Sequence, residues 1–231
     1  MRRFWREVLV TPVDDGHAIL LDTQPLRTPR KRPLVVPSAP LAAAIAAEWA
    51  GQAETADPRS MRLTRLATTR IDLFPEREAD ARAEIAGYLG SDLLAHRAAA
   101  PPELIAREAQ AWDPWLAWAA SALDLVIEPV TGVIARDPER AAVAVLDRHL
   151  ARLDPWRLVA VHAGTVLTGS CVLGLALESG ALAPQDAFVL AQLDELFEIE
   201  RWGMTDLARE RHARLRADLE AAAVFAAALR G

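Results

Sequence analysis

The chain is poor in several residue types that usually carry chemistry. Among its 231 residues it has one cysteine, Cys171, and one lysine, Lys31, and it has no asparagine. A single cysteine excludes an internal disulfide, so the cysteine count gives no sign of an oxidising compartment. The sequence also lacks a His-Glu-x-x-His zinc helix, a glycine-rich phosphate loop, a nucleophile elbow and a Cys-x-x-Cys pair. The usual signatures of zinc-dependent, nucleotide-binding and hydrolytic enzymes are therefore absent.

Acidic charge dominates the chain but is unevenly distributed. Residues 1–37 hold seven Lys/Arg and four Asp/Glu, a net +3, whereas residues 38–231 hold the remaining 19 and 28, a net −9. The total of −6 argues against a nucleic-acid-binding scaffold. An acidic body suits a basic partner, but solubility alone would favour the same charge.

No targeting segment is recognisable at the start of the sequence. Met1 to Glu7 contains three arginines and two aromatic residues. It has neither the apolar core of a secretory signal nor the length of an Arg/Ser-rich transit segment. We therefore expect a cytoplasmic protein.

The longest uncharged stretch of the chain runs from Leu158 to Leu177. Asp154 and Pro155 are typical residues for the start of a helix, and Gly180 is typical of the position just after one. We predict a central helix over 155–178 that is buried among other helices, because a helix that is apolar on all sides needs apolar neighbours.

A membrane span is the alternative interpretation of these twenty residues. Polar side chains and glycines within the stretch lower its apolar content too far for a bilayer, and we expect no membrane insertion. These residues are His162, Gly164, Thr165, Thr168, Gly169, Ser170, Cys171 and Gly174. His162 lies two helical turns from Ser170, too far to activate it as a nucleophile, so we interpret it as a buried, hydrogen-bonded histidine.

The pattern of the chain changes at residue 38, which predicts an α+β fold. Residues 1–37 are β-prone, with a hairpin signal at Asp14-Asp15-Gly16 and a basic loop over 27–32 that we expect to be solvated. From Ser38 onward the apolar residues follow helical spacing. We expect a small antiparallel β-rich region (1–37) packed on a mainly helical domain (38–231) with about seven helices. The last two are expected over 184–202 and 205–229.

Residues 193–203 combine helical periodicity with an acidic face. On a helical wheel of about 100° per residue, the apolar stripe consists of Val189, Leu190, Leu193, Leu196 and Phe197. The other side carries four residues that we call the acidic ridge: Asp194, Glu195, Glu198 and Trp202. Glu200 falls inside the apolar stripe, where a carboxylate costs free energy unless it is paired.

Several interpretations of the acidic ridge are open. It could be a solvated helix face, with Glu200 bonded to an arginine of the body or exposed at a fraying end. It could be a partner-binding surface, because carboxylates give specificity and tryptophan supplies buried area. A small-molecule enzyme could use Glu195, Glu198 or Glu200 as an acid/base couple or as metal ligands. Nothing else in the sequence supports that chemistry, so we expect no catalytic residues, no metal and no cofactor.

Short motifs along nearly the whole chain resemble those of one protein family, the assembly chaperones that bind the alpha subunit of the F-type ATP synthase catalytic sector. Each motif is weak alone, but their order and spacing are specific. They are Phe4-Trp5, Leu21-Asp22-x-x-Pro25-Leu26-x-Thr28-Pro29, Leu34-Val35-Val36-Pro37-Ser38, Ala47-Glu48-Trp49, Thr64 to Asp72, Gly90-Ser91-Asp92-Leu93-Leu94, Trp112-Asp113-Pro114, and Asp194-Glu195 through Trp202-Gly203.

The resemblance implies a chaperone without enzymatic activity, in a bacterial cytoplasmic form. It would bind the unassembled alpha subunit and prevent non-productive association until the beta subunit arrives. The resemblance also assigns the acidic helix to partner binding, with Glu195 as the clearest match. Glu198 stands where glutamine is usual, which makes the ridge more acidic. We expect a free monomer. A scaffold that stays permanently associated is a further alternative.

Overall fold

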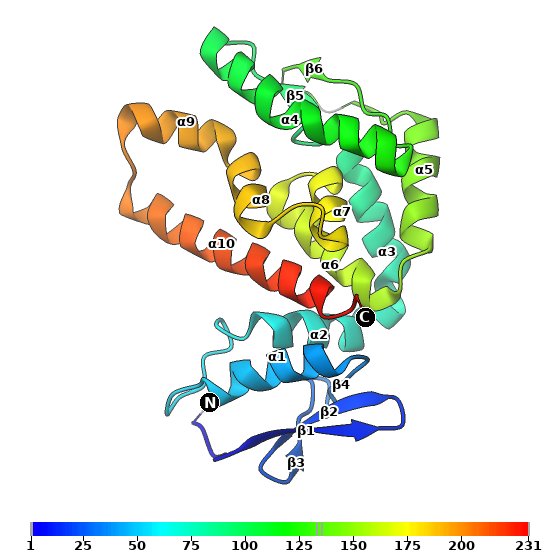
Figure 1. Cartoon of the computed structure of the whole chain (residues 1–231), viewed down its shortest axis with the longest axis vertical. Coiled ribbons are helices and arrows are strands. Elements are labelled where there is room, and N and C mark those ends of the chain that lie inside the picture. Colours follow the sequence, from blue (N-terminus) through cyan, green and yellow to red (C-terminus); the bar gives the residue numbers. More distant parts are fainter. Residues whose placement is uncertain (1, 133, 135, 231) are drawn as a thin grey trace.

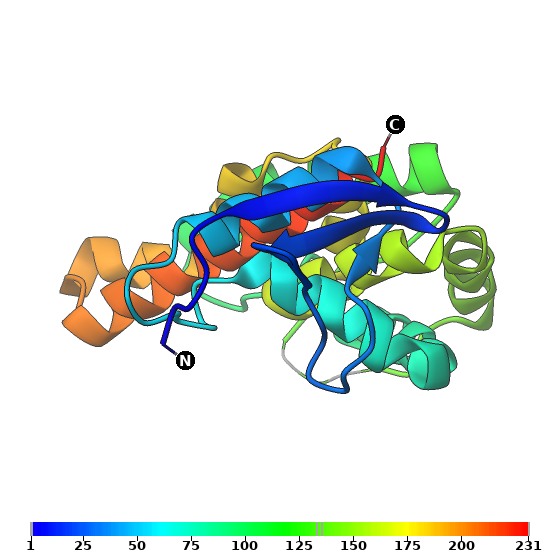
Figure 2. The same ribbon diagram turned by 90° about the horizontal axis from the view of Figure 1, so that it is seen from below.

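A small antiparallel sheet covers one end of a helical body, which confirms the expected α+β fold (Figure 1). The structure is a computed structural model that describes residues 2–132, 134 and 136–230. The sheet contains β1 (Val8–Val13), β2 (Gly16–Leu21), β3 (Gln24–Pro25) and β4 (Val35–Val36). Seen from below, the sheet lies over the first helix (Figure 2).

The predicted hairpin joins β1 and β2 at Asp14-Asp15. Gly16 begins β2 with φ +139°, and a Cβ added there would lie 2.4 Å from the carbonyl oxygen of Val36. Only glycine fits this position, because an L side chain would be strained and would also meet the neighbouring backbone. β3 and β4 both pair with β2, so β2 is the strand on which the sheet is built.

Two helices connect the sheet to the body, α1 (Ala39–Ala50) and α2 (Arg62–Asp72). The hydroxyl of Ser38, where the helical pattern was expected to start, accepts the N–H of Leu41 at 3.3 Å and caps α1. Leu41 and Ile45 are completely buried against the sheet side of the core. Helical spacing of apolar residues therefore identified the buried face of α1 correctly.

The remaining elements follow α2 in chain order. They are α3 (Phe74–Gly87), a 3₁₀ turn (Tyr88–Gly90), β5 (His96–Arg97), α4 (Pro102–Leu123), β6 (Val130–Thr131), α5 (Arg140–Ala151), α6 (Pro155–Thr168), α7 (Cys171–Ser179), α8 (Pro184–Ala191), α9 (Leu193–Trp202) and α10 (Asp206–Ala227). β5 and β6 form a short parallel pair. α4 continues through Pro114, and Trp112 at its centre is buried, with its indole N–H donating to Leu190.

The expectation of one central helix over 155–178 is wrong, because the stretch forms two helices. Gly169 has φ +73° and its N–H bonds the carbonyl of Thr165 at 2.8 Å, which ends α6. Ser170 then accepts the N–H of Leu173 at 3.1 Å and caps α7. The expected burial is present, since α7 is buried over most of its length. None of the helices in the described part of the chain combines the length and apolar character needed to cross a bilayer.

A second expected helix, 184–202, is also divided. Gln192 has φ −116° and ψ 19°, outside the helical region, so α8 ends there and α9 starts in a new direction. α9 consequently runs outward from the body, as Figure 1 shows. The described residues contain ten α-helices where about seven were expected, and these two divisions account for most of the difference.

Two glycines allow α6 and α7 to lie in direct backbone contact. A Cβ on Gly164 would lie 3.0 Å from Cα of Gly174. A Cβ on Gly174 would lie 2.4 Å from Oγ1 of Thr165 and 2.9 Å from the carbonyl oxygen of Val161. Because both helices are buried, neither can move outward without opening the core.

Gly174→Ala should therefore destabilise the protein strongly, by about 1–3 kcal/mol, the usual cost of overpacking a core. Gly87→Ala is the matched control, because among the described residues no atom outside the adjoining turns of α3 lies within 4 Å of a Cβ at this position. It should be neutral or stabilising by up to about 1 kcal/mol. Urea unfolding followed by circular dichroism measures both. Equal stability of the two variants would contradict the direct contact of α6 and α7.

Candidate functional site

α9 and the first half of α10 extend away from the rest of the molecule (Figure 1). We call residues 193–216 the arm. Gly203, with φ +83°, ends α9, and Thr205 accepts the N–H of Ala208 at 3.1 Å to cap α10. The arm holds all four residues of the acidic ridge, so its contacts decide which of them are available to a partner.

Trp202 and Glu198 point to solvent, as predicted. Trp202 is 85% exposed at the end of α9, and Glu198 is also exposed. Across the turn, Leu207 is 73% exposed near the start of α10. Sequence reasoning did not identify Leu207, because an apolar residue near a helix start is ordinary. Together Trp202 and Leu207 place two large exposed apolar side chains near the end of the arm.

Glu195 does not point freely to solvent. Its carboxylate forms an ion pair with Arg211 of α10, and its Oε1 lies 3.2 Å from Nε2 of the buried His212, without hydrogen-bond geometry. The His212 ring packs edge-on against Phe188. Glu195 thus lies between α9 and α10. The helical wheel treated α9 as isolated and could not show this contact.

Asp194 is exposed at the surface of α9, but it also contacts the body of the protein. Its carboxyl group interacts with that of Glu108, a completely buried residue of α4 whose carboxylate oxygens accept the N–H of Ala98 at 2.9 and 3.2 Å. Burial raises the pKa of Glu108, and the nearby Asp194 raises it further. Burial likewise raises the pKa of Asp194, and the charge of Glu198 adds to this. A proton on Glu108 donated to Asp194 gives the pair a favourable contact between α4 and α9.

Glu200 is paired with an arginine of the body, one of the two expected situations. Arg107 of α4 donates two hydrogen bonds to it, at 2.8 and 2.9 Å, and these bonds lower the pKa of Glu200. Arg107 and Arg201 also lie against the ring of Phe197. Three carboxylates of α9 therefore hold the arm in place, and Glu198 is the ridge carboxylate most open to a partner.

The ion pairs of Glu195 and Glu200 argue against the alternative interpretation of these carboxylates as an acid/base or metal site. Glu195 and Glu200 are each paired with arginine, so they do not form a carboxylate couple with Glu198. Within the described residues, no three His, Cys, Asp or Glu side chains are grouped so that they could hold a metal ion. His162 is hydrogen-bonded as expected, with Nε2 2.9 Å from Glu84, but it is only partly buried.

Several of the sequence motifs have structural roles near the sheet. The Glu48 carboxylate accepts the backbone N–H groups of Leu63 and Thr64 at 2.7 and 2.9 Å and caps α2. The indole of Trp49 donates to the hydroxyl of Thr64 at 3.1 Å. The motif Ala47-Glu48-Trp49 therefore fixes the start of α2 on the end of α1.

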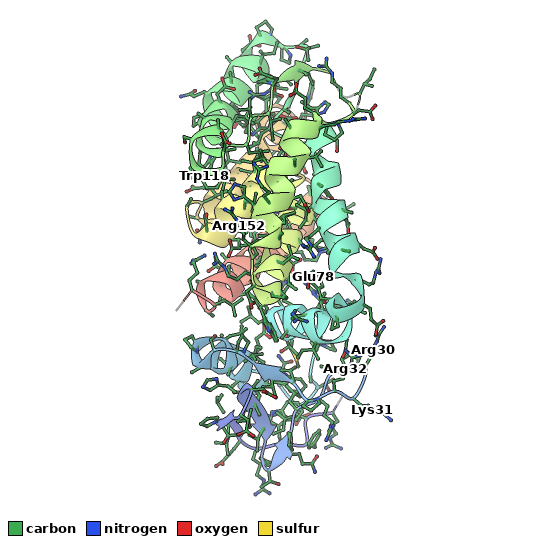
Figure 3. All side chains as sticks on the ribbon, turned by 90° about the vertical axis from the view of Figure 1, so that its right-hand side faces the viewer. Arg30, Lys31, Arg32, Glu78, Trp118 and Arg152 are labelled. Atoms are coloured by element: carbon green, nitrogen blue, oxygen red, sulfur yellow. The ribbon has the colours of Figure 1, made fainter. Side chains whose placement is uncertain are left out.

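The basic loop is solvated at its outer side, but it is anchored to the end of α2. The buried hydroxyl of Thr28 donates to Asp72 at 2.8 Å, and the N–H of Arg30 donates to the same carboxylate at 3.1 Å. Arg32 donates to the carbonyl of Ile71. Figure 3 shows Arg30, Lys31 and Arg32 gathered beside this end of α2.

Asp92, from the Gly90 to Leu94 motif, caps α7 from the other half of the chain. It is completely buried and accepts the N–H of Leu94 at 3.0 Å and the N–H of Cys171 at 2.8 Å. Burial raises the pKa of Asp92 and raises the pKa of the Cys171 thiol well above its usual value. Cys171 is thus a buried thiol in a structural contact and not an activated nucleophile.

Comparisons with known proteins agree with this architecture. The family model for the ATP12 chaperone protein matches residues 2–120. The crystal structure of Atp12 from Paracoccus denitrificans is 38% identical with a TM-score of 0.91, and the match covers 99% of this chain and 98% of that one. The Atu1473 protein of Agrobacterium tumefaciens is 40% identical with a TM-score of 0.94, covering 99% of this chain and 86% of that one. These structural matches include the arm.

Glu195→Lys should loosen the arm. The change removes two contacts of α9 with α10 and places a new positive charge beside Arg211, so we expect a loss of about 1–2 kcal/mol in unfolding free energy. Glu195→Gln should cost less, because it adds no like charge. Urea unfolding gives the free energies, and hydrogen exchange over 193–216 locates the change. Wild-type exchange in Glu195→Lys would show that Glu195 does not hold α9 against α10.

The carboxyl pair of Asp194 and Glu108 predicts a pH dependence. With both pKa values raised in the folded state, the unfolded chain releases its protons first, so stability falls as pH rises above the ordinary carboxyl range. Asp194→Asn should reduce the loss of stability as the pH rises from about 4 toward neutrality, as measured by thermal unfolding at each pH. Asp147→Asn, at an exposed position of α5, is the control and should keep the wild-type slope. An unchanged slope in Asp194→Asn would contradict the pairing.

Proposed function

Because the chain belongs to the ATP12 chaperone family, we propose that it assists assembly of the ATP synthase catalytic sector by binding the unassembled alpha subunit. It prevents non-productive association of that subunit and releases it when the beta subunit arrives. In this proposal the protein is not an enzyme, acts in the cytoplasm and is a monomer when free.

The observation that carries this proposal is the exposed Trp202 at the end of a fixed helix. Large aromatic side chains dominate the energetics of protein interfaces, and Trp202 leaves most of its surface in solvent in the free protein. Ion pairs on both sides of α9, with Arg107 and with Arg211, fix its direction. A helix whose direction is already fixed needs little further ordering on binding, which favours affinity.

Of the four ridge residues, two contact the client directly and two act in part by positioning α9. Glu198 meets basic groups of the client and raises specificity and association rate, while Trp202 buries apolar area. Asp194 and Glu195 act in part through the position of α9, since each contacts another helix. Glu195→Lys would therefore weaken client binding through two effects, loss of charge and movement of the arm.

Capture of purified alpha subunit from the same host tests the proposal. Trp202→Ala should weaken binding by about 2 kcal/mol or more, roughly 30-fold, because truncation of a central tryptophan is typically that costly. Glu198→Lys should mainly lower the association rate, with an effect that shrinks in high salt. Surface plasmon resonance measures both, and added beta subunit should displace the client.

Val166→Ala and Asp147→Lys are the matched controls. They alter an exposed apolar residue of α6 and an exposed carboxylate of α5, away from the arm. Both should bind like the wild type. If wild-type protein captures no alpha subunit, the proposed function is wrong. If it captures the subunit but Trp202→Ala binds equally well, the client surface lies elsewhere.

A further inference from the structure

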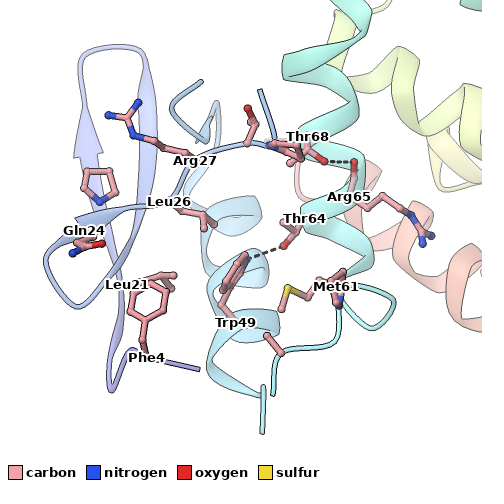
Figure 4. Close-up of a pocket in the computed structure, with 15 residues that line it drawn as sticks. Phe4, Leu21, Gln24, Leu26, Arg27, Trp49, Met61, Thr64, Arg65 and Thr68 are labelled. Atoms are coloured by element: carbon pink, nitrogen blue, oxygen red, sulfur yellow. Dashed lines mark hydrogen bonds between the residues drawn. The ribbon is translucent and has the colours of Figure 1, made fainter. Parts of the chain in front are cut away.

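A deep apolar groove lies between the sheet and the first two helices, far from the acidic ridge. It encloses about 770 Å³, within the range of roughly 300–1,000 Å³ typical of ligand sites. In Figure 4, Phe4, Leu26 and Trp49 reach it from three different segments. Its apolar lining consists of Phe4, Leu21, Pro25, Leu26, Pro29, Trp49, Ala56, Pro58 and Met61.

The polar side chains along the groove are largely engaged within the protein. Thr64 donates to Glu48 at 2.9 Å and accepts the indole N–H of Trp49. Thr28 donates to Asp72 at 2.8 Å, and Thr68 donates to the carbonyl of Arg65 at 2.9 Å. An occupant therefore finds few free hydrogen-bond partners and gains affinity mainly by burying apolar side chains.

Phe4 is left exposed at this groove. Phe4 is 58% exposed, although the next residue, Trp5, is buried. The two rings pack edge-on with their centroids 5.2 Å apart. An exposed phenylalanine beside a cavity lined by apolar residues provides a large contact area that the free protein leaves uncovered. An occupant of the groove would cover Phe4.

The charge of the lining is positive. Among the described residues that line the groove, the charged side chains are Arg27 and Arg65, and none is a carboxylate. Arg65 donates to Asp218 at 2.8 Å and turns away from the groove (Figure 4). Arg27 is exposed, with a hydrogen bond from one terminal nitrogen to the carbonyl of Lys31 at 3.0 Å. The groove also belongs to the positively charged end of an otherwise acidic chain. These charges suit an apolar occupant that carries a carboxylate.

We propose that the groove binds a short segment of the client polypeptide in which large apolar side chains adjoin an aspartate or glutamate. The proposal rests on the proposed function and adds a second contact, with Phe4 and Trp49 covering the apolar side chains and Arg27 pairing with the carboxylate. The volume admits a few side chains and not the face of a folded domain. Pro25 in β3 has no N–H to donate, so binding depends on side chains more than on strand addition.

Photo-crosslinking identifies the occupant directly. The photoreactive p-benzoylphenylalanine replaces Phe4 in the full-length chain, and purified alpha subunit is added before irradiation. We expect a covalent adduct with alpha subunit, mapped by mass spectrometry to one segment with apolar residues beside Asp or Glu. The same label in place of Leu9, an exposed residue of β1 outside the lining, is the control and should give no such adduct.

The mapped segment is then synthesised as a peptide. Its affinity for variants of the groove measures how much each lining side chain contributes to binding. Phe4→Ala should weaken binding at least about 5-fold, because it removes exposed aromatic area. Arg27→Glu should weaken it about 10-fold at low salt and less at high salt. Leu9→Ala and Lys31→Glu change exposed residues of the same region that do not line the groove, and should bind like wild type. Replacing the peptide carboxylate by its amide should abolish the difference between wild type and Arg27→Glu.

The outcomes separate this proposal from the proposed function. Failure of wild-type protein to capture alpha subunit would refute the proposed function and this proposal with it. Capture that depends on Trp202 but gives no crosslink from position 4, with Phe4→Ala and Arg27→Glu binding like their controls, would overturn the groove proposal alone. A crosslink to a second copy of this chain in the absence of alpha subunit would also overturn it.

Discussion

The backbone contact between α6 and α7 is the constraint on which the helical body depends. Gly164 and Gly174 bring the two helices together without side chains between them, and α2, α3, α8 and α10 pack around that centre. Because a close-packed interior tolerates only small shifts, the contact between α6 and α7 determines the positions of the outer helices. The second half of α10 packs on this centre, and its first half reaches beyond the centre and, with α9, forms the arm.

Local features of the fold could be predicted from the sequence, and contacts between distant segments could not. The hairpin at Asp14-Asp15-Gly16 and the caps at Ser38 and Asp154 depend on neighbouring residues, so their chemistry is visible in the sequence. The division at Gly169-Ser170 had a local signal too, a glycine that ends a helix followed by a serine that starts one. The long uncharged stretch concealed it.

In the candidate site too, local features could be predicted from the sequence and contacts between distant segments could not. The wheel placed Glu198 and Trp202 correctly, because their exposure depends on α9 alone. It misjudged Glu195, whose partner Arg211 lies on the next helix, and it gave no sign that Asp194 meets Glu108 on α4. The resemblance to a chaperone family was correct over the matched residues 2–120, where the motifs include structural caps such as Glu48 and Asp92.

The cap that Asp92 provides also constrains the order of events during synthesis. Its partner, the N–H of Cys171, lies 79 residues further along the chain. At roughly 5–20 residues per second, the ribosome needs on the order of 4–16 seconds to produce that partner. During this time the Asp92 carboxylate has to remain hydrated, because burial without its partner would be costly. The N-terminal half can therefore form its hairpin and first helices early. The centre of the helical body closes only after α7 has left the ribosome.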